Sequence, residues 1–149
     1  MHHGPMEKIT KLDIAKRQID TAINLLFDKN DLCSIITLAG AGEEILGRLL
    51  RHRGEIHAVD RIIEDVGNLL KEFFPNEKIP TREEMVAKLN NARNHLKHLD
   101  QPDSFEFEVD LFVGALGMLN RAVDNYEQVT GMLSDNMKRF RKINEKVNA

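Results

Sequence analysis

The sequence predicts an all-α protein, an antiparallel bundle of five to six helices. Over most of the 149 residues, apolar side chains recur at steps of three and four, the stripe of an amphipathic helix. Residue types that cap helices precede several of these stretches, and no segment alternates apolar and polar residues as a strand does. We therefore expect one helical domain over residues 7–149, and we interpret residues 1–6 as a tag or a disordered leader.

The first two predicted helices cover residues 7–28 and 32–53. Asp31 can cap the second helix through its side-chain oxygens, and that helix is apolar on most sides. Gly40, Gly42 and Gly47 lie inside it, where a glycine costs roughly 1 kcal/mol of helix propensity relative to alanine. We expect a neighbouring helix to approach closely at these glycines.

The third predicted helix covers residues 56–74 and stops at Pro75. The fourth begins after Thr81, which has a glutamate, Glu84, three residues later, the spacing of a capping box. This helix is expected to continue to about Leu99.

The fifth predicted helix is capped by Asp103 or Ser104 and ends at Gly131. From about residue 134 a last stretch alternates apolar positions with several lysines and arginines, which predicts a basic amphipathic C-terminal helix.

The composition is that of an ordinary globular protein, with 42% hydrophobic and 30% charged residues. No apolar run approaches the roughly 18 residues of a membrane span, and no signal peptide is evident, so a cytoplasmic protein without membrane contact is expected. The formal net charge of −3 argues against nucleic-acid binding by bulk electrostatics. Any RNA contact must be local.

Common cofactor and metal motifs are missing from the sequence. Gly40-Ala41-Gly42 is not followed by the second glycine and Lys-Ser/Thr pair of a phosphate-binding loop. Neither His-Glu-x-x-His nor the Glu-x-x-His pairs of a di-iron bundle occur. We therefore expect no cofactor and no metal.

The densest group of chemically active residues is the segment 90–98, near the end of the fourth predicted helix. A histidine such as His98 titrates near pH 7 and can exchange a proton with a hydroxyl group. The planar guanidinium of Arg93 suits a phosphate or its pentavalent transition state. These residue types fit RNA cleavage without a metal.

The segment Arg93-Asn94-x-x-x-His98 resembles the Arg-x(4 to 6)-His signature of HEPN domains, in which Asn, Asp or His typically follows the arginine. Residues 38–46 also resemble the small-residue second helix of that family, which bears an acidic position. The resemblance implies a metal-independent endoribonuclease that acts as a homodimer on RNA. Members of that family are often toxins paired with a nucleotidyltransferase-like antitoxin, which is the partner that the resemblance implies. Because other members are inactive, the alternative is a non-catalytic helical dimer that binds a nucleotide or a partner protein.

The resemblance also assigns roles to individual residues. It makes Arg93, Asn94 and His98 catalytic. The neighbouring His95 and Lys97 would bind RNA or phosphate. Glu43 and Glu44 would orient the site. Because Arg93 and His98 are five residues apart, they lie roughly 140° apart around a helix. A second copy across a dimer axis would then complete the site.

Plainer interpretations stay open for the same residues. His98 can stabilise a helix C-terminus, and Arg93 can form an ion pair with Glu43. A second segment, Arg51 to His57, also has the Arg-to-His spacing and carries a histidine after its arginine. We rank it below the first because it lies early in the chain and Gly54 divides it between two helices.

Overall fold

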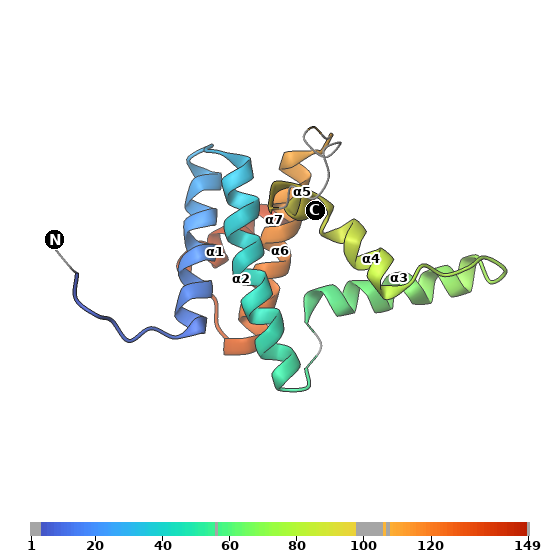
Figure 1. The fold of residues 1–149 in the computed structure, drawn as a ribbon. Coiled ribbons are helices and arrows are strands. Elements are labelled where there is room, and N and C mark those ends of the chain that lie inside the picture. The colour runs from blue at the N-terminus through green and yellow to red at the C-terminus, as the bar shows by residue number, and fades with distance from the viewer. Residues whose placement is uncertain (1–3, 56, 98–105, 107, 149) are drawn as a thin grey trace.

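A computed structural model describes residues 4–55, 57–97, 106 and 108–148, and this part of the chain contains seven helices and no strand (Figure 1). The helices are α1 Lys11–Phe27, α2 Leu32–His52, α3 Ala58–Phe73, α4 Arg82–Leu89, α5 Asn91–Lys97, α6 Leu111–Thr130 and α7 Asp135–Asn148. The all-α prediction is confirmed. Among the described residues, none of the helices has the length and apolarity that crossing a bilayer requires.

The core lies between α1, α2 and α6, with α7 packed against α1 (Figure 1). The predicted close approach is confirmed at Gly40 and Gly42 of α2 but not at Gly47, where an added Cβ would meet nothing nearer than His57 at 3.7 Å. A Cβ atom added at Gly42 would lie 2.7 Å from Ile19 Cγ1 and 3.2 Å from the Ala15 carbonyl oxygen on α1. One added at Gly40 would lie 2.6 Å from Arg93 Cδ. The glycines therefore let α1 and an α5 side chain contact the backbone of α2.

Several predicted helix ends are also confirmed. Asp31 accepts hydrogen bonds from the backbone N–H groups of residues 33 and 34, and Thr81 accepts one from Glu84. Gly131 ends α6 in the left-handed region, with φ at 71°. The first helix starts later than residue 7, because Thr10 and Asp13 form a reciprocal capping box before Lys11.

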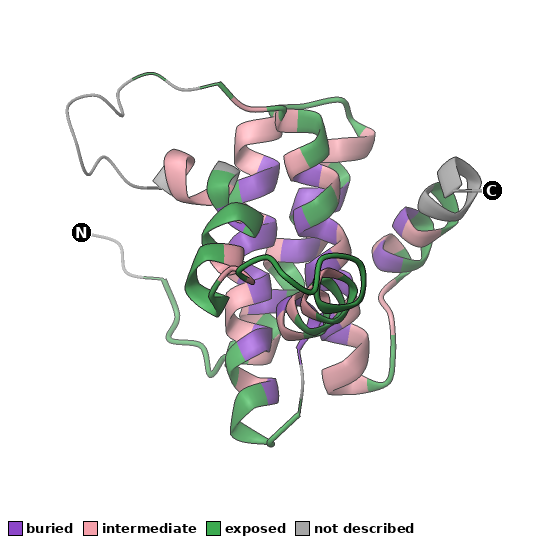
Figure 2. Cartoon of the chain, turned by 90° about the vertical axis from the view of Figure 1, so that its right-hand side faces the viewer, coloured by how far each residue is buried: buried purple, intermediate pink, exposed green. Residues whose placement is uncertain are grey.

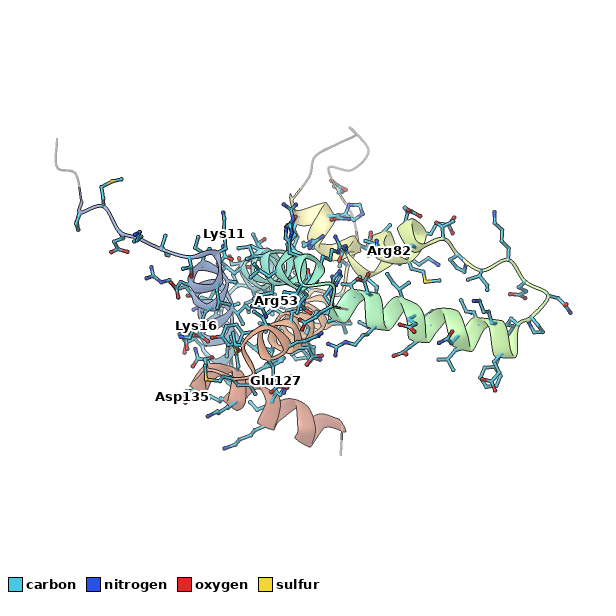
Figure 3. All side chains as sticks on the ribbon, turned by 90° about the horizontal axis from the view of Figure 1, so that it is seen from below. Lys11, Lys16, Arg53, Arg82, Glu127 and Asp135 are labelled. Atoms are coloured by element: carbon cyan, nitrogen blue, oxygen red, sulfur yellow. The ribbon has the colours of Figure 1, made fainter. Side chains whose placement is uncertain are left out.

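Helices α3 and α4 lie side by side and project from the bundle as a helical arm (Figure 1). Figure 2 shows this arm end-on, mostly exposed, in front of a bundle whose inner faces are buried. Only Ala58 and Val59, at the base of α3, are buried in these two helices. Arg82 on α4 forms an ion pair with Asp60 in the first turn of α3, which ties the two helices together (Figure 3).

The structure corrects two predicted boundaries. The fourth predicted helix is two helices, because the backbone leaves helical geometry at Asn90 (φ −100°, ψ 7°), whose buried side chain accepts a hydrogen bond from Arg121. The helix predicted to follow Asp103 or Ser104, which lie outside the described residues, begins at Leu111 instead. Asp110 caps it by accepting a hydrogen bond from the Val113 backbone N–H.

Candidate functional site

A buried carboxylate, Glu43 on α2, connects the bundle to α5. The residue is 4% exposed. Arg121 Nη2 on α6 donates to its Oε1 at 3.1 Å, and Arg93 Nη1 on α5 donates to its Oε2 at 3.3 Å. One carboxylate thus holds two guanidinium groups, which leaves an excess of positive charge in a poorly hydrated place.

Arg121 extends this cluster to the neighbouring helices. Its Nη1 donates to Asn90 Oδ1 at 2.8 Å and to the Leu89 carbonyl oxygen at 3.3 Å. Burial lowers the pKa of Arg121, and the Glu43 carboxylate opposes that shift. The guanidinium keeps its charge at neutral pH, because an arginine pKa starts far above 7.

Asn125, which is fully buried on α6, joins the same cluster to the start of α3. Its Nδ2 lies 3.5 Å from the Glu43 carbonyl oxygen, and its Oδ1 accepts a 2.8 Å hydrogen bond from the Ala58 backbone N–H. The base of the arm is therefore attached to the polar centre of the bundle.

A pocket of about 180 Å³ opens beside this cluster. Its charged lining consists of Arg48, Arg51, Arg93 and Arg121 against Glu43 and Glu44, so four arginines face two glutamates. His57, Asn90 and Gly47 complete much of the polar wall. The pocket has a net positive charge of two although the chain as a whole is acidic, and it is suited to an anion.

His57 lies at the start of α3 and is 3% exposed. Its Nε2 is 3.0 Å from Arg51 Nε and 3.0 Å from Asp60 Oδ2, so one nitrogen faces both a donor and an acceptor. Burial lowers the pKa of His57, while Asp60 opposes the shift. We assign a neutral ring whose Nε2 accepts from Arg51, because arginine can only donate.

The structure brings some of the predicted site residues together. Arg93, Glu43 and Glu44 line the same pocket, where Glu44 also pairs with Arg48 on its own helix at 3.0 Å. The described lining does not include Asn94 or His95, which follow Arg93 on α5 and are half-buried. The side chain of Lys97 and the whole of His98 lie outside the described residues.

A second, larger pocket of about 690 Å³ lies between the arm and α6. Its lining is mixed, with Ile62 and Val113 among the apolar residues and Lys88 among the charged ones. Arg93 and Arg121 line both pockets. Arg93 and Arg121 therefore lie between the two pockets and contribute to the lining of each.

Two residues of the cluster, Arg121 and Asn125, were not predicted from the sequence. Both interrupt the apolar stripe of α6, where the neighbouring positions 118, 119, 122, 123 and 126 are buried. A charged residue on a buried stripe needs a partner, and this signal could have identified Arg121 as the second cation on Glu43.

No family model, curated protein or solved structure matches the chain. The resemblance to HEPN domains thus rests on the residues named above. In the described ranges, no three His, Cys, Asp or Glu side chains are grouped so that they could hold a metal ion.

Proposed function

We propose that this protein is a metal-independent endoribonuclease of the HEPN type. The observation that carries the proposal is the position of Arg93. Its guanidinium is held by the buried Glu43 carboxylate in the wall of a positively charged pocket. An arginine oriented in this way can stabilise the extra negative charge of a pentavalent phosphate without having to reorganise.

In the proposed reaction His98 serves as the general base or acid at the 2′-hydroxyl or the leaving oxygen. Asn94 orients the phosphate, with His95 and Lys97 contributing to its binding. The oxygen of the 2′-hydroxyl attacks the adjacent phosphorus, and the bond to the 5′-oxygen breaks. The products are a 2′,3′-cyclic phosphate and a 5′-hydroxyl, and no metal takes part.

The proposed active form is a homodimer. Arg93 and His98 are five residues apart in the sequence, which is roughly 140° around an ideal helix, so the spacing alone does not direct both toward one phosphate in a single copy. Two copies related by a two-fold axis bring the arginine of one toward the histidine of the other. A cellular role as a toxin that is neutralised by a nucleotidyltransferase-like antitoxin is part of the same proposal.

The test is cleavage of single-stranded RNA by the purified protein in EDTA. We expect wild-type protein to produce cyclic-phosphate ends and both Arg93→Ala and His98→Ala to lose at least about a hundredfold in rate, the usual contribution of a general acid or base. Arg53→Ala is the matched control, because Arg53 is exposed at the end of α2 and donates to the Val129 carbonyl oxygen (Figure 3). Equal cleavage by wild type and both variants would refute the assignment.

A second candidate function is a non-catalytic helical dimer that binds a nucleotide or a partner protein. The burial of the Arg93 side chain, which is 18% exposed and paired with Glu43, favours it. Such a protein would show saturable ligand binding, or a partner that co-purifies, with no RNA cleavage under the same conditions.

A further inference from the structure

Three residues that line the pocket beside Glu43 each contain a buried side-chain nitrogen. His57 Nδ1, Arg93 Nε and Arg121 Nε are buried and have no hydrogen-bond partner among the described residues. All three residues line the same pocket. Buried polar atoms in folded proteins are nearly always paired, so three unpaired atoms around one recess indicate a ligand rich in acceptor oxygens.

The hydrogen bond from Arg51 to His57 determines which ring nitrogen of His57 carries the proton. Arg51 Nε donates to His57 Nε2 at 3.0 Å, so the neutral ring carries its proton on Nδ1. This Nδ1 lies against α2 at Gly47, where an added Cβ would lie 3.8 Å away. His57 Nδ1 is therefore a buried N–H group that has no hydrogen-bond acceptor among the described residues.

These two residues are the ends of the second Arg-to-His segment found in the sequence. Gly54, which divides that segment between two helices, adopts φ at 71° in the turn between α2 and α3. The turn brings the side chains of Arg51 and His57 into hydrogen-bond contact. We rank this segment second partly because Gly54 divides it. The turn at Gly54 is nevertheless what brings Arg51 and His57 together, within one copy of the chain.

The net charge and the volume of the pocket are also consistent with an anionic ligand. The lining holds four arginines and two glutamates, so an anion is favoured. The pocket volume of about 180 Å³ is some ten times the ~10–15 Å³ that a single water requires, which leaves room for a tetrahedral oxyanion.

We propose that this pocket binds a phosphate group through His57 Nδ1–H, Arg51 and Arg93, which line it together with Arg121. The inference deepens the proposed function and rests on it for the identity of the ligand as an RNA phosphate. The site is complete within one copy of the chain, and it differs in this respect from the Arg93 and His98 pair.

The test is calorimetric titration of wild-type protein with inorganic phosphate in EDTA at pH 7. We expect saturable binding of one phosphate per chain, weakened about tenfold or more by Arg51→Gln and by His57→Ala, since each removes a charge-assisted or buried hydrogen bond. His57→Asn, which can place an amide N–H near the former Nδ1, should recover part of the affinity. His52→Gln is the matched control, because His52 is exposed in the same segment and does not line the pocket.

A second measurement avoids variants. In wild-type protein labelled with ¹⁵N-histidine, phosphate should shift the imidazole resonances of His57 and leave those of His52 in place. A dinucleoside phosphodiester tested in parallel distinguishes the sources of the group, because tighter binding of the diester assigns an RNA backbone and tighter binding of inorganic phosphate assigns a terminal phosphate. Absence of saturable binding, or equal affinity of wild type and Arg51→Gln, would overturn the site.

The two proposals fail separately. Phosphate binding without RNA cleavage would remove the nuclease and leave the site, whereas RNA cleavage by a protein that shows no saturable phosphate binding would leave the nuclease and remove the site.

Discussion

The bundle and the arm are built from helices with similar sequence patterns and have very different surroundings. On α1 the apolar residues Ile19 and Ile23 are fully buried. On α3 the apolar residues Val66, Leu69 and Phe73 recur at the same kind of spacing, yet they are 39%, 54% and 67% exposed. Figure 2 shows this contrast between the buried inner faces of the bundle and the exposed arm.

The difference in exposure between α1 and α3 shows what helical periodicity specifies and what it does not. The spacing of apolar residues specifies which face of a helix is apolar, because side chains three and four apart share a face. It does not specify which other element covers that face. In α1 and α2 the neighbouring helices provide the cover, whereas Val66, Leu69 and Phe73 on α3 remain exposed.

The largest expected effect is at the junction of the two regions. Glu43→Gln removes the one carboxylate that pairs with both Arg93 and Arg121, and loss of a partner from a buried ion pair typically costs about 3–5 kcal/mol. We expect the free energy of unfolding, measured by urea denaturation, to fall by about that amount. The control is Glu44→Gln, since Glu44 is only half-buried on the same helix.

This prediction also tests how firmly the arm depends on the bundle. Hydrogen exchange in the Glu43→Gln protein should increase first at α5 and at the start of α3, which the cluster attaches to α2 and α6. If stability and exchange matched those of Glu44→Gln, the cluster would not be the link between the two regions.

A matched pair of leucines tests the contrast itself. Leu46 on α2 is fully buried, and Leu69 on α3 is 54% exposed. Leu46→Ala should lower the free energy of unfolding by about 3 kcal/mol, through lost burial and the cavity left behind. Leu69→Ala should change it by less than about 0.5 kcal/mol, as surface substitutions usually do. A comparable loss in both variants would show that the arm is covered in solution.

The sequence predicted the helices well because their signals are local. Caps at Asp31 and Thr81, the glycine at 131 and the three- and four-residue spacings each depend on residues within a few positions of one another. The break at Asn90 was not predicted, since it depends on Arg121, 31 residues further along the chain.

The candidate site was only partly predictable for the same reason. The ion pair between Arg93 and Glu43 was among the alternatives, because each residue is unusual in its own helix. The contact between Arg121 and Glu43 joins residues 78 positions apart, and no spacing within either helix encodes it. The contact between Arg51 and His57 depends on the turn at Gly54. The sequence pattern indicated only that Gly54 separates two helices, not that the turn brings these side chains together.

The smallest effect concerns His57, where the arm meets the bundle. The groups around it are Arg51 and Glu43 on α2, Asp60 on α3 and Arg82 on α4, and burial is the largest cause of its lowered pKa. The folded protein therefore takes up a proton on His57 less readily than the unfolded chain, whose histidine has its ordinary pKa of about 6.5. Stability from this source is fully present above pH 6.5 and is lost as the pH falls below that value toward the folded pKa.

Urea midpoints measured between pH 7.5 and pH 5 should show this loss, with a slope of at most about 1.4 kcal/mol per pH unit for one proton. The chain contains 6 His, so the informative quantity is the difference between variants. His57→Asn should flatten the dependence, whereas His52→Gln should keep the wild-type slope because His52 is exposed. If His57→Asn retained that slope, burial would not lower the pKa of His57. A steeper loss in His57→Asn would mean that His57 is charged in the folded protein and donates to Asp60, and the assigned Nδ1–H form would be wrong.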